Sequence, residues 1–102
     1  MCSSDLLAPQ MATPAFPHDH RPFNERSITV NGAEREYFEQ VFWSGLFTAP
    51  LLPSTLFPTG PSADGLPIGV QAVSAPYRDH RTIQFADLIS REIGGFTPPP
   101  GF

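Results

Sequence analysis

Residues 54–73 constrain the fold of this chain more than any other stretch. Two apolar runs, Ser54–Phe57 and Leu66–Val73, flank a segment rich in proline and glycine that contains Asp64-Gly65. Asp-Gly between apolar runs indicates a turn, because glycine has no Cβ to clash at positive φ and aspartate tolerates the left-handed region. Alternate residues of the second run share one face of a strand: Ile68, Val70 and Ala72. We therefore predict a buried hairpin of strand, long turn and strand.

Shorter segments before this hairpin carry weaker signals. Asp5–Pro9 is typical of a short apolar strand ended by proline, and Thr13–Pro17 is typical of irregular structure. Arg26–Val30 alternates polar and apolar residues and predicts a strand, which the tight-turn dipeptide Asn31-Gly32 follows.

Two helices are predicted from apolar periodicity. The first runs from Glu34 to about Phe47, where residues at i, i+3, i+4 and i+7 form one face: Phe38, Val41, Phe42 and Gly45. The second covers Thr82–Ile93, with Asp79 as its expected N-cap and Gly94-Gly95 at its end. Residues 97–102 form a proline-rich tail. The expected fold class is therefore α/β.

Composition excludes several classes of function. A chain of 102 residues forms one domain at most. Its net charge is −4 and its basic residues are all arginine, which argues against nucleic-acid binding. No apolar run approaches the roughly 20 residues that a membrane span requires. The single cysteine, Cys2, cannot form an intramolecular disulfide, and no signal peptide is recognisable, so we expect a cytoplasmic protein with no membrane partner.

The hairpin resembles the C-terminal hairpin of the amidase signature family. The similar residues are Pro58-Thr-Gly60 and the run from Asp64 to Gln71, Asp-Gly-Leu-Pro-Ile-Gly-Val-Gln. The resemblance implies that residues 1–102 form a partial amidase domain, the C-terminal portion of an α/β/α sandwich with a mixed central sheet. Within it, structural roles in the turn and in close strand packing are expected for seven residues: Pro58, Gly60, Asp64, Gly65, Pro67, Gly69 and Gln71. Many relatives carry Gly-Leu-Pro where this chain has Leu51-Leu52-Pro53, which leaves the local backbone geometry open.

The resemblance also implies an activity, the hydrolysis of linear carboxylic amides by a Ser-Ser-Lys triad. This chain contains no lysine and no Gly-Gly-Ser-Ser-Gly-Gly-like segment, and arginine stays protonated, so it cannot replace the lysine. We therefore predict no catalytic residue here and no activity of the chain alone. Val41 and Trp43 fall on the helix that, in related amidases, helps to wall the acyl side of the substrate pocket. The alternative for both is simple core packing.

The implied partners are a small-molecule amide in the complete enzyme, and either the missing N-terminal part of the domain or a second copy of the chain. No metal or organic cofactor is implied. An alternative function is a non-catalytic binding or dimerisation module, or the complementing half of a split amidase.

Other polar residues have simpler interpretations. His18 and His20 could form a metal pair, but neither His80 nor Cys2 offers a clear third ligand, so a solvated loop is the better account. Three serines are interpreted as turn and sheet-edge residues: Ser54, Ser62 and Ser74.

Overall fold

The structure is a computed structural model that describes residues 5–101; Cys2 lies outside this range. Four strands and two helices match the sequence signals at least in part, and a further strand and two 3-10 turns complete the order. The elements are β1 (Leu6–Pro9), η1 (Phe23–Glu25), β2 (Ser27–Val30), β3 (Ala33–Glu36), η2 (Tyr37–Val41), α1 (Phe42–Thr48), β4 (Ser54–Pro61), β5 (Pro67–Val73) and α2 (Asp79–Ile93).

The predicted hairpin is confirmed and forms most of a three-stranded sheet. The strand order is β1-β5-β4, and both strand pairs are antiparallel. Ala72 of β5 lies opposite Leu7 of β1 and Thr55 of β4. β2 and β3 form a separate two-stranded antiparallel ribbon. Because all these pairs are antiparallel, the mixed sheet of a complete amidase domain stays a prediction.

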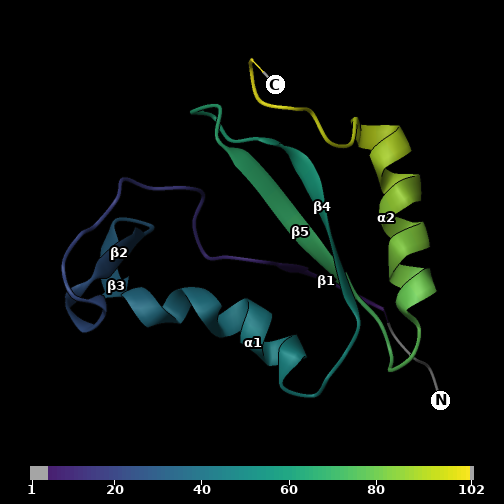
Figure 1. Cartoon of the computed structure of the whole chain (residues 1–102), viewed down its shortest axis with the longest axis horizontal. Coiled ribbons are helices and arrows are strands. Elements are labelled where there is room, and N and C mark those ends of the chain that lie inside the picture. Colours follow the sequence, from purple (N-terminus) through teal and green to yellow (C-terminus); the bar gives the residue numbers. More distant parts are fainter. Residues whose placement is uncertain (1–4, 102) are drawn as a thin grey trace.

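The two helices lie on opposite sides of the three-stranded sheet (Figure 1). Val73 contacts Ala8 of β1 and Phe47 of α1. Its neighbour Ala72 contacts Phe57 of β4 and Ala86 of α2. Successive residues of a strand point to opposite faces, so these two small clusters are separated by the sheet itself. The described residues therefore form a layered α/β arrangement.

The hairpin is buried only at the end away from its turn, which corrects the prediction of a buried hairpin. Phe57 and the residues from Gln71 to Val73 are buried, but Ile68 is 40% exposed and Pro61 and Pro67 are exposed. The buried contacts with α2 come from the turn-distal half of the strands, where Phe57 and Ala72 meet Ala86.

The predicted helix from Glu34 to about Phe47 is wrong over residues 34–36, whereas Tyr37–Val41 is helical in the 3-10 form. Ala33–Glu36 forms β3 instead, paired with β2, and only Phe42–Thr48 is α-helical. The physical reason is the turn before it: Asn31 and Gly32 have φ of 51° and 78°, which is the geometry of a two-residue hairpin turn that returns the chain along β2.

The second helix begins earlier than predicted, and Asp79 is not its N-cap. Asp79 is the first helical residue, Arg78 occupies the N-cap position, and no side chain there makes a capping hydrogen bond. The carboxylate of Asp79 still lies in the first turn, where the helix dipole favours negative charge. The predicted end is confirmed, since Gly94 at the C-cap is left-handed.

Helix α1 ends in a turn that places a leucine in the left-handed region. Leu51 has φ of 57°, and its N–H donates to the carbonyl of Thr48 at 3.0 Å. The N–H of Leu52 then donates to the carbonyl of Phe47 at 3.1 Å, which resembles the Schellman ending of helices. This is the position where the family pattern has glycine, so the departure from that pattern falls on a strained residue.

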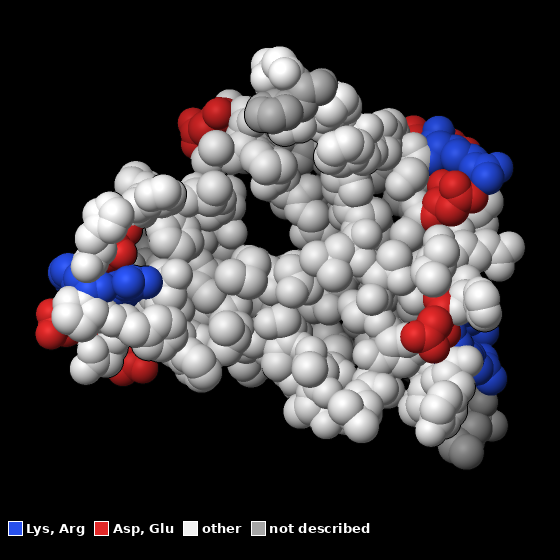
Figure 2. All heavy atoms as spheres, in the orientation of Figure 1, with Lys and Arg blue, Asp and Glu red and all other residues white. Residues whose placement is uncertain are grey.

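The core is small for the length of the chain. Among residues 5–101, seven apolar residues are buried, while seventeen large apolar residues are exposed. The radius of gyration is 15.6 Å, against about 13 Å for a compact domain of 100 residues. Figure 2 shows the charged side chains at the periphery of the visible face, around a broad uncharged middle.

Candidate functional site

The residues of the hairpin motif hold the turn and the close approach of its strands. Ser62 closes the turn, because its Oγ accepts a hydrogen bond from the N–H of Leu66 at 3.1 Å and its N–H donates to the carbonyl of Leu66 at 2.7 Å. Gly65 has φ of 77°, which this turn requires. On β5, a Cβ added to Gly69 would lie 3.3 Å from the carbonyl oxygen of Phe57. Asp64 lies in the turn, Pro67 pairs with Pro61, and Pro58 and Gly60 flank a β-bulge.

The side chain of Gln71, the last residue of the motif, joins three segments. It is 2% exposed, and its Nε2 donates to the carbonyls of Pro9 at 2.9 Å and Trp43 at 3.2 Å. Its Oε1 accepts a hydrogen bond from Ser54 Oγ at 2.8 Å. One side chain of β5 thus fixes β1, α1 and β4 relative to one another.

The two residues predicted to wall a substrate pocket have different surroundings in the structure. Trp43 is half-buried and packs against the cluster of Ala8, Phe47 and Val73, and its ring meets that of Phe42 edge-on at 5.3 Å. Val41 precedes α1 and is 40% exposed. The contacts of Trp43 match core packing on its inner side, and the pocket role of both residues stays a prediction.

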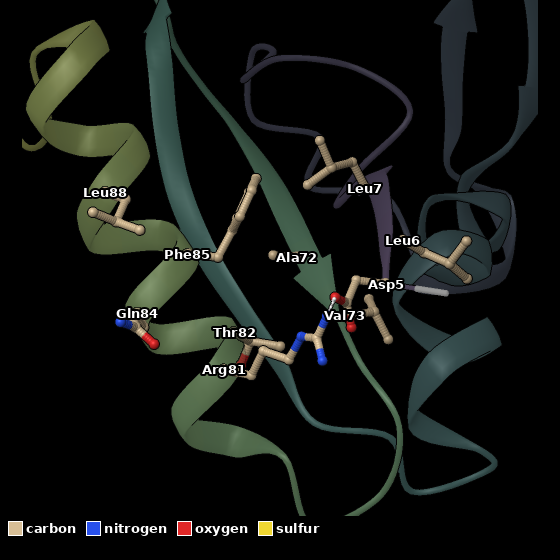
Figure 3. Close-up of a pocket in the computed structure, with 10 residues that line it drawn as sticks. All are labelled: Asp5, Leu6, Leu7, Ala72, Val73, Arg81, Thr82, Gln84, Phe85 and Leu88. Carbon is tan, nitrogen blue, oxygen red and sulfur yellow. Dashed lines mark ion pairs between the residues drawn. The ribbon is translucent and has the colours of Figure 1, made fainter. Parts of the chain in front are cut away.

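A groove of about 440 Å³ runs between β1 and α2 (Figure 3). Its walls come from elements distant in sequence: Leu7 of β1, Ala72 of β5, and Phe85 and Leu88 of α2. Leu7 and Leu88 are 60% and 52% exposed, so this largely apolar groove is open to solvent. It can take an apolar group, but the described residues that line it include no histidine, cysteine or serine able to act as a nucleophile or base.

An ion pair lies at one end of this groove. Arg81 Nη2 is 2.7 Å from Asp5 Oδ2, and it links α2 to the residue before β1 (Figure 3). The two side chains are 53% and 40% exposed, so water screens the pair and it contributes little to stability.

The two histidines of the N-terminal loop lie close together. The rings of His18 and His20 meet edge-on at 6.0 Å. The carboxylate between them, Asp19, is engaged by Arg21, whose Nε and Nη2 donate to it at 3.0 and 2.7 Å. These hydrogen bonds, together with one that the backbone N–H of Arg21 donates to Asp19 Oδ1 at 3.0 Å, lower the pKa of Asp19 from 3.8 to about 2. Within residues 5–101, no three His, Cys, Asp or Glu side chains come together as a metal site.

Of the other two serines, Ser54 on the edge strand β4 bonds across the sheet, and the buried Ser74 bonds locally. Ser54 binds Gln71, as described above, and Ser74 Oγ donates to the carbonyl of Arg78 at 3.2 Å. No helix within the described range is long and apolar enough to cross a membrane.

Comparisons with known proteins point to amide-hydrolysing enzymes. The chain is 40% identical to human fatty-acid amide hydrolase 2 over 60 residues, which are 59% of this chain. It is 37% identical over 57 residues, 56% of its length, to fatty-acid amide hydrolase 2-A of Danio rerio. It is 27% identical over 96 residues, 90% of its length, to a glutamyl-tRNA(Gln) amidotransferase component from Bartonella quintana. These relatives belong to the amidase signature family.

The extent of these similarities is limited. The matched segments span only 11% of each of the two fatty-acid amide hydrolases and 17% of the amidotransferase component. No family model matches the chain. The comparisons therefore show homology to amidase-signature proteins over part of their length.

Two features of the site were not foreseen from the sequence. The groove unites β1 and α2, which are more than sixty residues apart, so no local pattern signals it. Gln40 is 3% exposed and holds the N-terminal loop, accepting from the N–H of Ala12 at 3.2 Å and donating to Thr13 Oγ1 at 2.8 Å. Its place in the predicted first helix gave no sign of these contacts.

Proposed function

We propose that this chain is the C-terminal segment of an amidase-signature hydrolase that cleaves linear carboxylic amide C–N bonds. The observation that supports this most is the 40% identity to human fatty-acid amide hydrolase 2 over 60 residues. The hairpin motif, and a sheet that a helix contacts on each face, are consistent with a piece of an α/β/α sandwich.

In this proposal the chain supplies structure to the active site and no catalytic group. It has no lysine, so a Ser-Ser-Lys triad must come from the remainder of the domain. Its contributions are the hairpin, the helix α2 and, through Val41 and Trp43, part of the wall that contacts the acyl side of a small-molecule amide. The chain alone is inactive.

The test is a chimera of human fatty-acid amide hydrolase 2 in which this chain replaces the matched segment and the residues that continue it to the C-terminus. We expect the purified chimera to hydrolyse a fatty-acid amide and the chain alone to release no product. The control is the same hydrolase with the matched segment deleted and nothing put in its place. A folded, monodisperse chimera that hydrolyses no amide would overturn the proposal.

A second candidate is a non-catalytic module that folds alone and binds a partner or a second copy of itself. The exposed apolar side chains on both sides of the sheet favour this candidate: Leu6, Leu7, Leu56, Ile83 and Leu88. Co-expression of the chain with a hydrolase that lacks the matched segment distinguishes complementation from simple self-association, because only complementation restores amide hydrolysis.

A further inference from the structure

The hydrogen bonds of Gln71 use both of its donors and one acceptor position, and all three partners are fixed in the fold. Two partners are backbone carbonyls, those of Pro9 and Trp43, which lie 62 and 28 residues away in sequence. A backbone carbonyl has two lone pairs, so the carbonyl of Trp43 can take this bond beside its bond within the helix. At 2% exposure, no water can replace a lost partner without a rearrangement.

The bond from Gln71 to Trp43 joins α1 to the sheet, and few other side chains of α1 contact the sheet. Helix α1 is seven residues long, and its only buried side chain is Phe47. Phe42 and Leu46 are 59% and 48% exposed and give it no further anchor on the sheet. A bond from β5 to the backbone of Trp43, the second residue of the helix, therefore fixes where the indole lies along the sheet, together with the packing of that side chain against the buried cluster.

We propose that Gln71 is a positioning residue that sets the place of Trp43, and through it the shape of the acyl-side wall of the substrate pocket. The first half of this statement concerns the chain itself. The second half rests on the proposed function, because it requires that Trp43 contact the amide substrate.

The first half is tested by fluorescence, because Trp43 is the only tryptophan in the chain. Gln71→Met keeps the approximate length of the side chain and removes all three hydrogen bonds. We expect its Trp43 emission to shift to the red and its quenching by acrylamide to increase. The matched control is Thr82→Val, at a residue equally buried at 2% whose hydroxyl bonds Thr55 on the opposite face of the sheet at 2.8 Å. This control should lower stability and leave Trp43 emission unchanged.

Two results would overturn the positioning role. One is a folded Gln71→Met variant with wild-type emission and quenching. The other is fast exchange of the Gln71 side-chain amide protons in the wild-type chain. It is measured by NMR and serves where the variant does not fold. Slow exchange of the Gln71 side-chain amide protons, with a nuclear Overhauser effect to Trp43, supports the role, whereas fast exchange without that effect contradicts it.

The second half is tested in the chimera described above. We expect Gln71→Met to raise KM for a long-chain amide by about tenfold, equal to about 1.4 kcal/mol, with a smaller change in kcat, because a displaced wall weakens binding of substrate and transition state alike. Thr82→Val should leave KM unchanged. An inactive parent chimera would refute the proposed function and leave the fluorescence result standing. A displaced Trp43 with unchanged KM would refute the pocket role alone.

Discussion

At the scale of single residues, the contact between Arg21 and Asp19 gives the sharpest prediction. Its hydrogen bonds stabilise the carboxylate form and hold the pKa of Asp19 at about 2, below the ordinary 3.8. The stabilisation is therefore fully present above pH 3.8 and is lost as the pH falls through about 2. We expect Arg21→Ala to return the pKa of Asp19 toward 3.8, as measured by NMR titration of its carboxyl carbon.

A second arginine provides the control for this titration. Arg26 acts on Asp19 only through a weak long-range charge interaction, and its Nε donates to the backbone carbonyl of Arg21 at 2.7 Å. Arg26→Ala should therefore move the pKa of Asp19 much less than Arg21→Ala does. Equal shifts in the two variants would show that overall positive charge, and not the hydrogen bonds of Arg21, sets this pKa.

Single residues also mark where sequence reasoning reaches its limit. The family pattern singled out Gln71, but its partners, Pro9 and Trp43, are distant in sequence and become neighbours only once the sheet has formed. Gln40 carried no signal at all, because a polar residue in an apolar stretch does not show whether its side chain points to solvent or to a buried backbone. The chemical type of a residue is local information, and its hydrogen-bond partners are not.

At the scale of elements, local signals succeeded where the turn and the strands agreed. The hairpin of β4 and β5 followed from Asp64-Gly65 and the alternation after it, and both are properties of adjacent residues. The helix predicted from Glu34 is wrong at its start. The turn at Asn31-Gly32 brings residues 33–36 beside β2, and their pairing with β2 outweighs the helical periodicity. A helix start of this kind cannot be told from a strand until its pairing partner is known.

The end of α1 supplies a prediction at this scale. Leu51 is left-handed, and this conformation costs an L-residue roughly 1–2 kcal/mol. Leu51→Gly should relieve that cost, less the roughly 0.5–1 kcal/mol that glycine loses in backbone entropy. We expect a net gain of up to about 1.5 kcal/mol in the free energy of unfolding, measured by urea denaturation.

Leu51→Ala separates this effect from loss of the side chain. Leu51 is 84% exposed, so both substitutions remove little packing, but only glycine removes the Cβ that clashes in the left-handed region. Alanine should leave the stability nearly unchanged. A gain from alanine equal to that from glycine would attribute the effect to the exposed leucine side chain and not to the backbone.

At the scale of the whole molecule, the described residues leave much apolar surface uncovered. The two buried clusters contain three residues each, on opposite faces of the sheet, while the groove between β1 and α2 stays open. The sequence could not say where this uncovered surface lies. That location depends on how far α2 extends across the sheet.

The uncovered groove leads to the last prediction, which separates a segment of a larger domain from an independent module. A contiguous exposed apolar surface binds hydrophobic dyes and promotes association. We expect the chain alone to enhance the fluorescence of anilinonaphthalene sulfonate and to sediment as a concentration-dependent oligomer.

Leu7→Ser with Leu88→Ser, on opposite walls of the groove, should reduce both effects, whereas Phe96→Ser, in the exposed tail, should change them little. In the chimera the dye signal per chain should fall, because the rest of the domain then covers the groove. A chain that binds no dye and unfolds cooperatively, as a monomer or as a defined dimer, would instead identify an independent module, since its exposed leucines would then need no further cover.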